Sequence, residues 1–119
     1  MAKILVIDDE ELTLEMLSTF LRISGHEALP ALDSASGWAI LNSDDPEAIL
    51  LDIQLPDKNG LVMCRELREN PETADLPIIM ISAHAPPLID EAREAGATNY
   101  LAKPINLRTL QTTLAEALL

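Results

Sequence analysis

The stretch Leu50-Leu51-Asp52-Ile53-Gln54-Leu55-Pro56-Asp57 decides how the rest of the chain is interpreted. Residues 48–51 form a short, uninterrupted apolar run, which is typical of a strand buried on both faces of a sheet. Asp52 follows this run directly, and Pro56 places the next residues in a loop because proline cannot donate to a sheet ladder. A carboxylate at the carboxyl end of a buried strand is a candidate functional residue. Partners of Asp52 are therefore expected at the ends of neighbouring strands.

The length and composition exclude several classes of protein. A chain of 119 residues predicts one domain, 1–119, that buries roughly two-thirds of its unfolded surface. No apolar run approaches the ~20 residues of a membrane-spanning helix, so no membrane association is expected. Cys64 is the single cysteine, which predicts a reducing, cytoplasmic setting. The formal net charge of −12, without a visible basic patch, argues against direct contact with nucleic acid.

Five segments of the chain have the composition of β-strands. Three of them are continuously apolar and are expected in the middle of a sheet: 3–7, 48–51 and 77–81. Segment 27–32 contains Pro30 and segment 99–102 is less apolar, so both are expected at sheet edges.

Helices are expected between the strands. Leucines recur at helical spacing in the first, which ends near Gly25. The second is expected to be capped by Ser34 and to run to about Leu41, with 42–46 as a loop. Three more helices are expected: one between Gly60 and Asn70, one that ends at Gly96, and one that is capped by Asn106.

Alternating strands and helices predict an α/β fold, a doubly wound five-stranded parallel sheet with five helices on both faces. Right-handed crossovers, with the most apolar strands in the centre, favour the strand order 2-1-3-4-5. This order is that of flavodoxin-like folds. The carboxyl ends of all five strands then share one edge of the sheet.

Ionisable and hydroxyl side chains follow four of these strands. They are Asp8 and Asp9 after the first strand, Asp52 after the third, Ser82 after the fourth and Lys103 after the fifth. Neighbouring parallel strands lie about 4.8 Å apart, so the acids are expected to share one cation. Oxygen ligands with open positions suit Mg²⁺, and a metal with a lysine can neutralise a phosphoryl group while a carboxylate acts as nucleophile. Taken alone, each residue except Asp52 is better explained as a helix-terminus, strand-end or surface group. Together they predict phosphoryl transfer to a carboxylate of this group.

Crowding of these acids also has an electrostatic consequence. Without a cation, Asp8, Asp9 and Asp52 bring like charges together, and Lys103 offsets them only in part. Like charges disfavour ionisation, so at least one of these carboxyl groups is expected to have a raised pKa.

In combination and order, these residues resemble the receiver domain of two-component response regulators over essentially the whole chain. The matching segments are Asp8-Asp9, 51–60, Ser82-Ala83 and Tyr100-Leu101-Ala102-Lys103-Pro104.

The resemblance implies the chemistry of the site. Asp52 would accept a phosphoryl group from a histidine kinase or histidine phosphotransfer protein. Asp9 would bind Mg²⁺ directly, Asp8 largely through water, and Gln54 through its backbone carbonyl. Lys103 would contact the phosphoryl group and precede a cis proline.

The resemblance also implies how a signal leaves the site. Ser82 and Tyr100 match the switch pair of the family. Phosphorylation would draw Ser82 toward the phosphoryl group and turn Tyr100 inward, which changes the face formed by the fourth helix, fifth strand and fifth helix. A downstream protein would bind that face. The domain would not be an enzyme beyond its own phosphotransfer and dephosphorylation.

Three features depart from the common pattern. Serine occupies position 82, where threonine is commoner. The segment 82–96 is one residue shorter than usual and contains Pro86-Pro87, which predicts a different loop before the fourth helix. His84, two residues beyond Ser82, is interpreted either as a group that tunes dephosphorylation or as an exposed loop histidine.

Three alternative functions compete with a phosphorylated receiver. A haloacid-dehalogenase phosphatase needs a second acid two residues after its nucleophile, where this chain has Gln54. A flavodoxin-like electron carrier needs a phosphate-cradling loop and aromatic flavin contacts, and the sequence offers neither. A degenerate receiver that acts only as an interaction scaffold is disfavoured because every phosphorylation residue is present.

Overall fold

The protein is described by a computed structural model of residues 1–119. Its five parallel strands form a single sheet in the order β2-β1-β3-β4-β5. The strands are β1 (Lys3–Ile7), β2 (Glu27–Ala31), β3 (Ala48–Asp52), β4 (Ile78–Ser82) and β5 (Asn99–Ala102). The predicted fold class and strand order are therefore confirmed.

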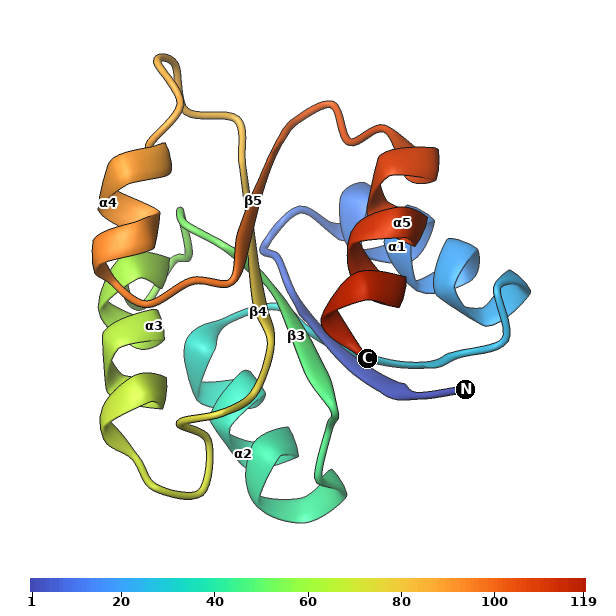
Figure 1. Cartoon of the computed structure of the whole chain (residues 1–119), viewed down its shortest axis with the longest axis horizontal. Coiled ribbons are helices and arrows are strands. Elements are labelled where there is room, and N and C mark those ends of the chain that lie inside the picture. The colour runs from blue at the N-terminus through green and yellow to red at the C-terminus, as the bar shows by residue number, and fades with distance from the viewer.

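Helices cover both faces of the sheet. In chain order they are α1 (Glu11–Ile23), α2 (Ser34–Asp44), α3 (Gly60–Glu69), α4 (Ile89–Glu94) and α5 (Leu107–Ala117). Helices α1 and α5 lie together on one face, and α2, α3 and α4 lie on the other (Figure 1).

The core consists of two apolar layers that share the central strands. Side chains alternate between the layers along a strand, so Ile49 and Leu51 pack beneath α2, α3 and α4, whereas Leu50 packs beneath α1 and α5. All three are fully buried. The apolar run before Asp52 is explained by this arrangement, because a strand covered on both faces has no side that must be polar.

Helix α2 differs from the sequence prediction at both ends. Its N-cap is Asp33, whose Oδ1 accepts a hydrogen bond from the Ser36 amide at 2.7 Å, and Ser34 is the first helical residue. The helix continues to Asp44, so the predicted loop at 42–44 is wrong. It ends where Asp45 adopts a left-handed conformation with φ of 50° directly before a proline, which disfavours the helical conformation of its predecessor.

One arginine joins three segments at the edge of the sheet opposite the strands' carboxyl ends. Arg68 of α3 donates to the carbonyls of Gly96 at 2.7 Å and Leu76 at 2.6 Å, and to that of Ala74 at 3.0 Å. Through these contacts it ties α3 to the segment before β4 and to the turn after α4.

The strand register aligns the chemically reactive ends. Ile7 pairs with Leu51, and Asp52 pairs with Ile81, so β1, β3 and β4 end at nearly the same level.

None of the five helices has both the length and the apolar character that a membrane-spanning helix needs.

Candidate functional site

Three carboxylates meet at the carboxyl edge of the sheet. One ligand oxygen from each of Asp8, Asp9 and Asp52 lies within 4.8 Å of the others. Asp8 follows β1 and is fully buried, Asp52 ends β3 and is 4% exposed, and Asp9 is exposed. The predicted gathering of these residues is confirmed.

Lys103 reaches the same cluster from the end of β5. Its Nζ lies 2.9 Å from Asp8 Oδ2 and 3.1 Å from Asp52 Oδ2, and 3.8 Å from Glu10 Oε1. The Lys103–Pro104 peptide bond is cis, as the resemblance implies. One ammonium therefore faces several carboxylates, and the site keeps an excess of negative charge.

The electrostatic environment shifts two pKa values. Burial raises the pKa of Asp52, the charge of Asp8 raises it further, and Lys103 opposes both. The expected direction is confirmed, although burial, rather than like charge, is the larger cause. Burial lowers the pKa of Lys103, but its close contact with Asp8 and the charge of Asp52 outweigh this and leave the pKa raised.

The oxygen atoms of the cluster fit a hard divalent cation. Asp8 Oδ1 accepts the Glu10 amide at 2.9 Å, and Asp52 Oδ1 accepts the Gln54 amide at 3.2 Å. Asp8 Oδ2 is buried and forms only the ion pair with Lys103, without a well-directed hydrogen bond. A buried anionic oxygen with free lone pairs beside two further carboxylates is the donor chemistry that Mg²⁺ prefers.

The loop that follows Asp52 closes tightly behind it. The Gly60 amide donates to the Ile53 carbonyl at 2.6 Å, and Gln54 and Asn59 form an antiparallel bridge across the loop. A Cβ at Gly60 would lie 2.8 Å from Ile53 Cα and closer still to the Asp52 carbonyl oxygen. Only glycine fits, because the helix start is packed against the backbone of Asp52.

Sequence reasoning missed one residue of this loop. The Asp57 carboxylate accepts hydrogen bonds from the Ser34 amide at 3.0 Å, the Ser34 hydroxyl at 2.7 Å and the Ala35 amide at 3.1 Å. These bonds lower the pKa of Asp57 to about 2. Nothing local signals this contact, because the partners lie 22 and 23 residues earlier in the chain.

Ser82 and His84 lie at the end of β4. Ser82 is buried, and its Oγ accepts a hydrogen bond from the His84 amide at 3.0 Å. The His84 ring is exposed, and its Nδ1 lies 2.8 Å from the Pro86 carbonyl oxygen. The loop is therefore folded back on itself, with the imidazole engaged by its own backbone.

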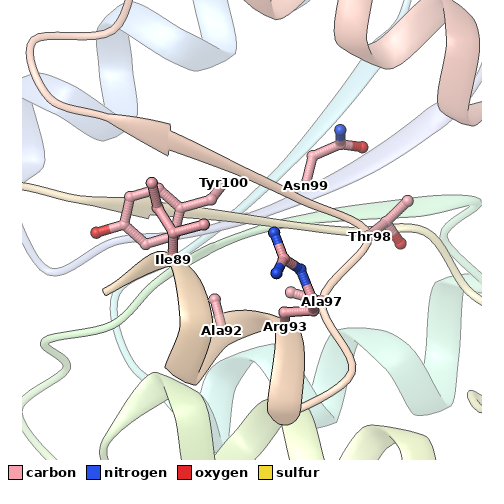
Figure 2. A pocket seen from close by; sticks show the side chains of 7 residues that line it. All are labelled: Ile89, Ala92, Arg93, Ala97, Thr98, Asn99 and Tyr100. Atoms are coloured by element: carbon pink, nitrogen blue, oxygen red, sulfur yellow. The ribbon is translucent and has the colours of Figure 1, made fainter. Parts of the chain in front are cut away.

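Tyr100 connects β5 to the start of α4. Its side chain is half-buried, and its hydroxyl accepts a hydrogen bond from the Leu88 amide at 3.1 Å. A pocket lies between α4 and β5, and Figure 2 shows Tyr100 and Ile89 among the side chains that line it. Helix α4 has only six residues and begins after an exposed segment that contains Pro86 and Pro87.

A family model described as the response regulator receiver domain matches residues 4–115. The chain belongs to this family. The match favours a receiver domain of two-component signalling over the haloacid-dehalogenase and flavodoxin-like alternatives.

Relatives of this receiver domain differ in length. Protein PilH of Pseudomonas aeruginosa is 32% identical over 120 residues, with 99% of this chain and 98% of that protein covered. The transcriptional regulator RpaA of Synechocystis is also 32% identical, with 92% of this chain and 46% of that protein covered. The receiver domain thus spans under half the length of RpaA, and 23% of the response regulator PleD of Caulobacter vibrioides.

Solved structures share the fold of this receiver domain over nearly its full length. A response regulator from Chloroflexus aurantiacus superposes with a TM-score of 0.93 at 31% identity, covering 98% of this chain and 97% of that one. The chemotaxis protein CheY4 of Vibrio cholerae superposes with a TM-score of 0.90 at 30% identity, covering 98% of both chains.

Proposed function

We propose that this receiver domain is a phosphoacceptor in which Asp52 takes a phosphoryl group from a histidine kinase or a histidine phosphotransfer protein. The observation that carries the proposal is the position of Lys103, whose Nζ lies 3.1 Å from Asp52 Oδ2 and 2.9 Å from Asp8 Oδ2. A buried carboxylate with an ammonium on one side and further acids on the other can hold a cation and still act as a nucleophile.

The transfer step forms one bond and breaks another. An oxygen of the Asp52 carboxylate attacks the donor phosphorus, and an O–P bond forms. The bond from phosphorus to the donor nitrogen breaks, and its electron pair leaves with the imidazole. Lys103 stabilises the negative charge on the transferring group, and the Ser82 hydroxyl donates to a phosphoryl oxygen after transfer.

Asp8, Asp9, Asp52 and the Gln54 backbone carbonyl would hold Mg²⁺. When bound, the ion neutralises charge on the phosphoryl oxygens. The residues themselves orient the acceptor, since the Gln54 amide fixes Asp52 Oδ1 at 3.2 Å and leaves Oδ2 beside Lys103.

Ser82 and Tyr100 would pass the change to the α4-β5-α5 face, where a downstream protein binds. Movement of Ser82 toward the phosphoryl group would act on the β4–α4 loop through the hydrogen bond that its Oγ accepts from the His84 amide. Tyr100 is hydrogen-bonded to the far end of the same loop. We infer no direct contact with nucleic acid, no catalysis beyond self-directed phosphotransfer and dephosphorylation, and action in the cytoplasm, where the thiol of Cys64 stays reduced.

Intact-mass spectrometry tests the proposal. Incubation with acetyl phosphate and Mg²⁺ should add one phosphoryl group to the wild type and none to Asp52→Asn. Asp75→Asn, which neutralises an exposed acid outside the site, should be labelled like the wild type.

Two results would overturn the proposal. Label that survives in Asp52→Asn would mean that another residue is the acceptor. An unlabelled but folded wild type would favour the interaction scaffold.

A further inference from the structure

The carboxylate of Asp57 joins the loop after Asp52 to a distant helix. It accepts three hydrogen bonds from the first turn of α2, at 2.7–3.1 Å. Ser34, which provides two of them, is 4% exposed, so its amide and hydroxyl have little access to water as an alternative partner. The contact between the two segments is therefore fixed by paired polar groups.

Helix α2 does not need Asp57 as its own cap. Asp33 already accepts the Ser36 amide at 2.7 Å from the usual N-cap position. Asp57 takes the remaining first-turn groups, from Ser34 and Ala35, and does so from another element. Its bonds therefore fix the position of a loop as well as completing a helix terminus.

The loop held in this way carries groups of the phosphoacceptor site. It leaves the sheet at Asp52, and the Gln54 amide donates to Asp52 Oδ1. It returns to the Asp52 backbone at Gly60. Between these points Gln54 and Pro56 are exposed, and Asp57 is the outward anchor of the segment.

We propose that Asp57 is a positioning residue for the phosphoacceptor site, which holds the Gln54 segment in place by binding the first turn of α2. The proposal rests on the proposed function in that Asp52 and Gln54 belong to a Mg²⁺-dependent site. Residues that orient a ligand without touching the metal commonly contribute tenfold or more to its binding. Loss of the Asp57 anchor should act on the site through Gln54 and leave the ligand atoms of Asp8 and Asp9 in place.

Calorimetric titration of the full chain with Mg²⁺ tests this role. Asp57→Ala should weaken the Mg²⁺ affinity about tenfold and slow labelling by acetyl phosphate at subsaturating Mg²⁺. Asp57→Asn keeps one acceptor oxygen and should restore part of the affinity. Ser34→Ala removes one of the three donors, so it should weaken binding less, and it should add nothing to Asp57→Ala.

Asp33→Ala is the matched control, because it removes the other carboxylate from the same helix terminus without touching the loop. It should lower the melting temperature but leave the Mg²⁺ affinity within about twofold, which lies below the loss expected for a residue that orients a metal ligand. Equal effects of Asp33→Ala and Asp57→Ala on Mg²⁺ affinity would overturn the positioning role, as would an unchanged affinity in Asp57→Ala. If Asp57→Ala does not fold, Asp57→Asn and Ser34→Ala decide the question by the same comparison.

The two proposals fail in distinguishable ways. A wild type that binds Mg²⁺ but takes no phosphoryl group contradicts the proposed function, while the titrations still decide the role of Asp57. A labelled wild type with unaltered Mg²⁺ binding in Asp57→Ala contradicts only the positioning role.

Discussion

Two loops leave the same edge of the sheet and are held in opposite ways. The β3–α3 loop, 53–59, is closed by the backbone contact at Gly60 and anchored to α2 by three hydrogen bonds. The β4–α4 loop, 83–88, is exposed except at half-buried Leu88, and one side-chain hydrogen bond secures each end. Those bonds run from the His84 amide to Ser82 and from the Leu88 amide to Tyr100.

The difference matches the roles that we propose for the two loops. A single neutral hydrogen bond contributes about 0.5–1.5 kcal/mol, which a bound group can easily exceed. A backbone packed against a helix start has no comparable alternative arrangement. The β3–α3 loop, to which we assign the chemistry, is thus the fixed loop. The β4–α4 loop, to which we assign signalling, is the exchangeable loop, because a bound group can replace its contacts.

The largest expected effect is that of Gly60→Ala in the fixed loop. The new Cβ would meet the backbone of Asp52 and Ile53, which cannot rotate away, so the free energy of unfolding should fall by about 3 kcal/mol. Ala83→Ser also adds one heavy atom, but at an exposed position in the other loop, and should change it by less than about 0.5 kcal/mol. Urea denaturation measures both. Equal losses would mean that the loops are equally constrained.

Neutralising Asp52 should stabilise the metal-free protein. The pKa of Asp52 is raised above its ordinary value of 3.8, so its contribution to stability falls as pH rises through 3.8 toward the folded-state pKa. Asp52→Asn removes this loss and should raise the free energy of unfolding in EDTA at neutral pH by about 1 kcal/mol after solvent screening. Asp9→Asn is expected to act in the same direction by removing a nearby negative charge.

With Mg²⁺ bound, the wild type should become more stable than the two Asn variants. Mg²⁺ at a hundredfold excess over its dissociation constant should stabilise the wild type by about 2.7 kcal/mol, and both Asn variants should lose most of this gain. Thermal melts with Mg²⁺ or EDTA provide the measurement. Variants that melt below wild type in EDTA and respond to Mg²⁺ as it does would show that these acids do not share a metal site.

Tyr100→Phe removes one of the two bonds that hold the exchangeable loop. Loss of the hydroxyl leaves the Leu88 amide without its partner and should cost about 1 kcal/mol. Amide hydrogen exchange should accelerate at Leu88 and leave Gly60, in the fixed loop, unchanged. Unaltered exchange at Leu88 would mean that the prolines alone order the segment.

His84→Ala is expected to have the smallest effect. The ring is exposed and contacts the Pro86 carbonyl, so stability should change by no more than about 0.5 kcal/mol and the lifetime of the acyl phosphate by no more than about twofold. The decay of phosphorylated protein after donor removal measures the lifetime. A larger change, with Mg²⁺ affinity unaltered, would support the hypothesis that the imidazole acts on the hydrolytic water.

Most of the fold followed from local patterns. The apolar runs of β1, β3 and β4 are unmistakable because both faces of these strands are covered, and the strand order then brings Asp8, Asp52 and Lys103 together. Helix α2 was less accurately predicted, since its last turn, Asn42 to Asp44, consists of residues that also favour turns.

Contacts between segments distant in sequence were not predictable. Asp57 has the local sequence of a turn residue, and Arg68 that of an exposed helix residue, yet each binds groups in other elements. His26 follows the glycine that ends α1, and it is half-buried with its Nδ1 accepting the Ala2 amide at 3.1 Å. Periodicity reports which face of an element is buried, and it carries no information about which distant polar group a side chain meets.

The contact between Arg68 and Gly96 fixes the C-terminal end of α4, so that α4 can pivot about this end. The carbonyl of Gly96 is held at 2.7 Å by Arg68, and the Ala95 carbonyl lies 3.4 Å from Cys64 Sγ, so the end of α4 near these residues is clamped to α3. At the opposite end, the Leu88 amide donates to the Tyr100 hydroxyl, and the half-buried Leu88 side chain packs against the core. A displacement at that end must therefore rotate the six-residue helix, about 9 Å long at 1.5 Å per residue, instead of translating it. Ile89 is exposed and is the first residue of α4, so its side chain would be displaced more than those near the fixed end.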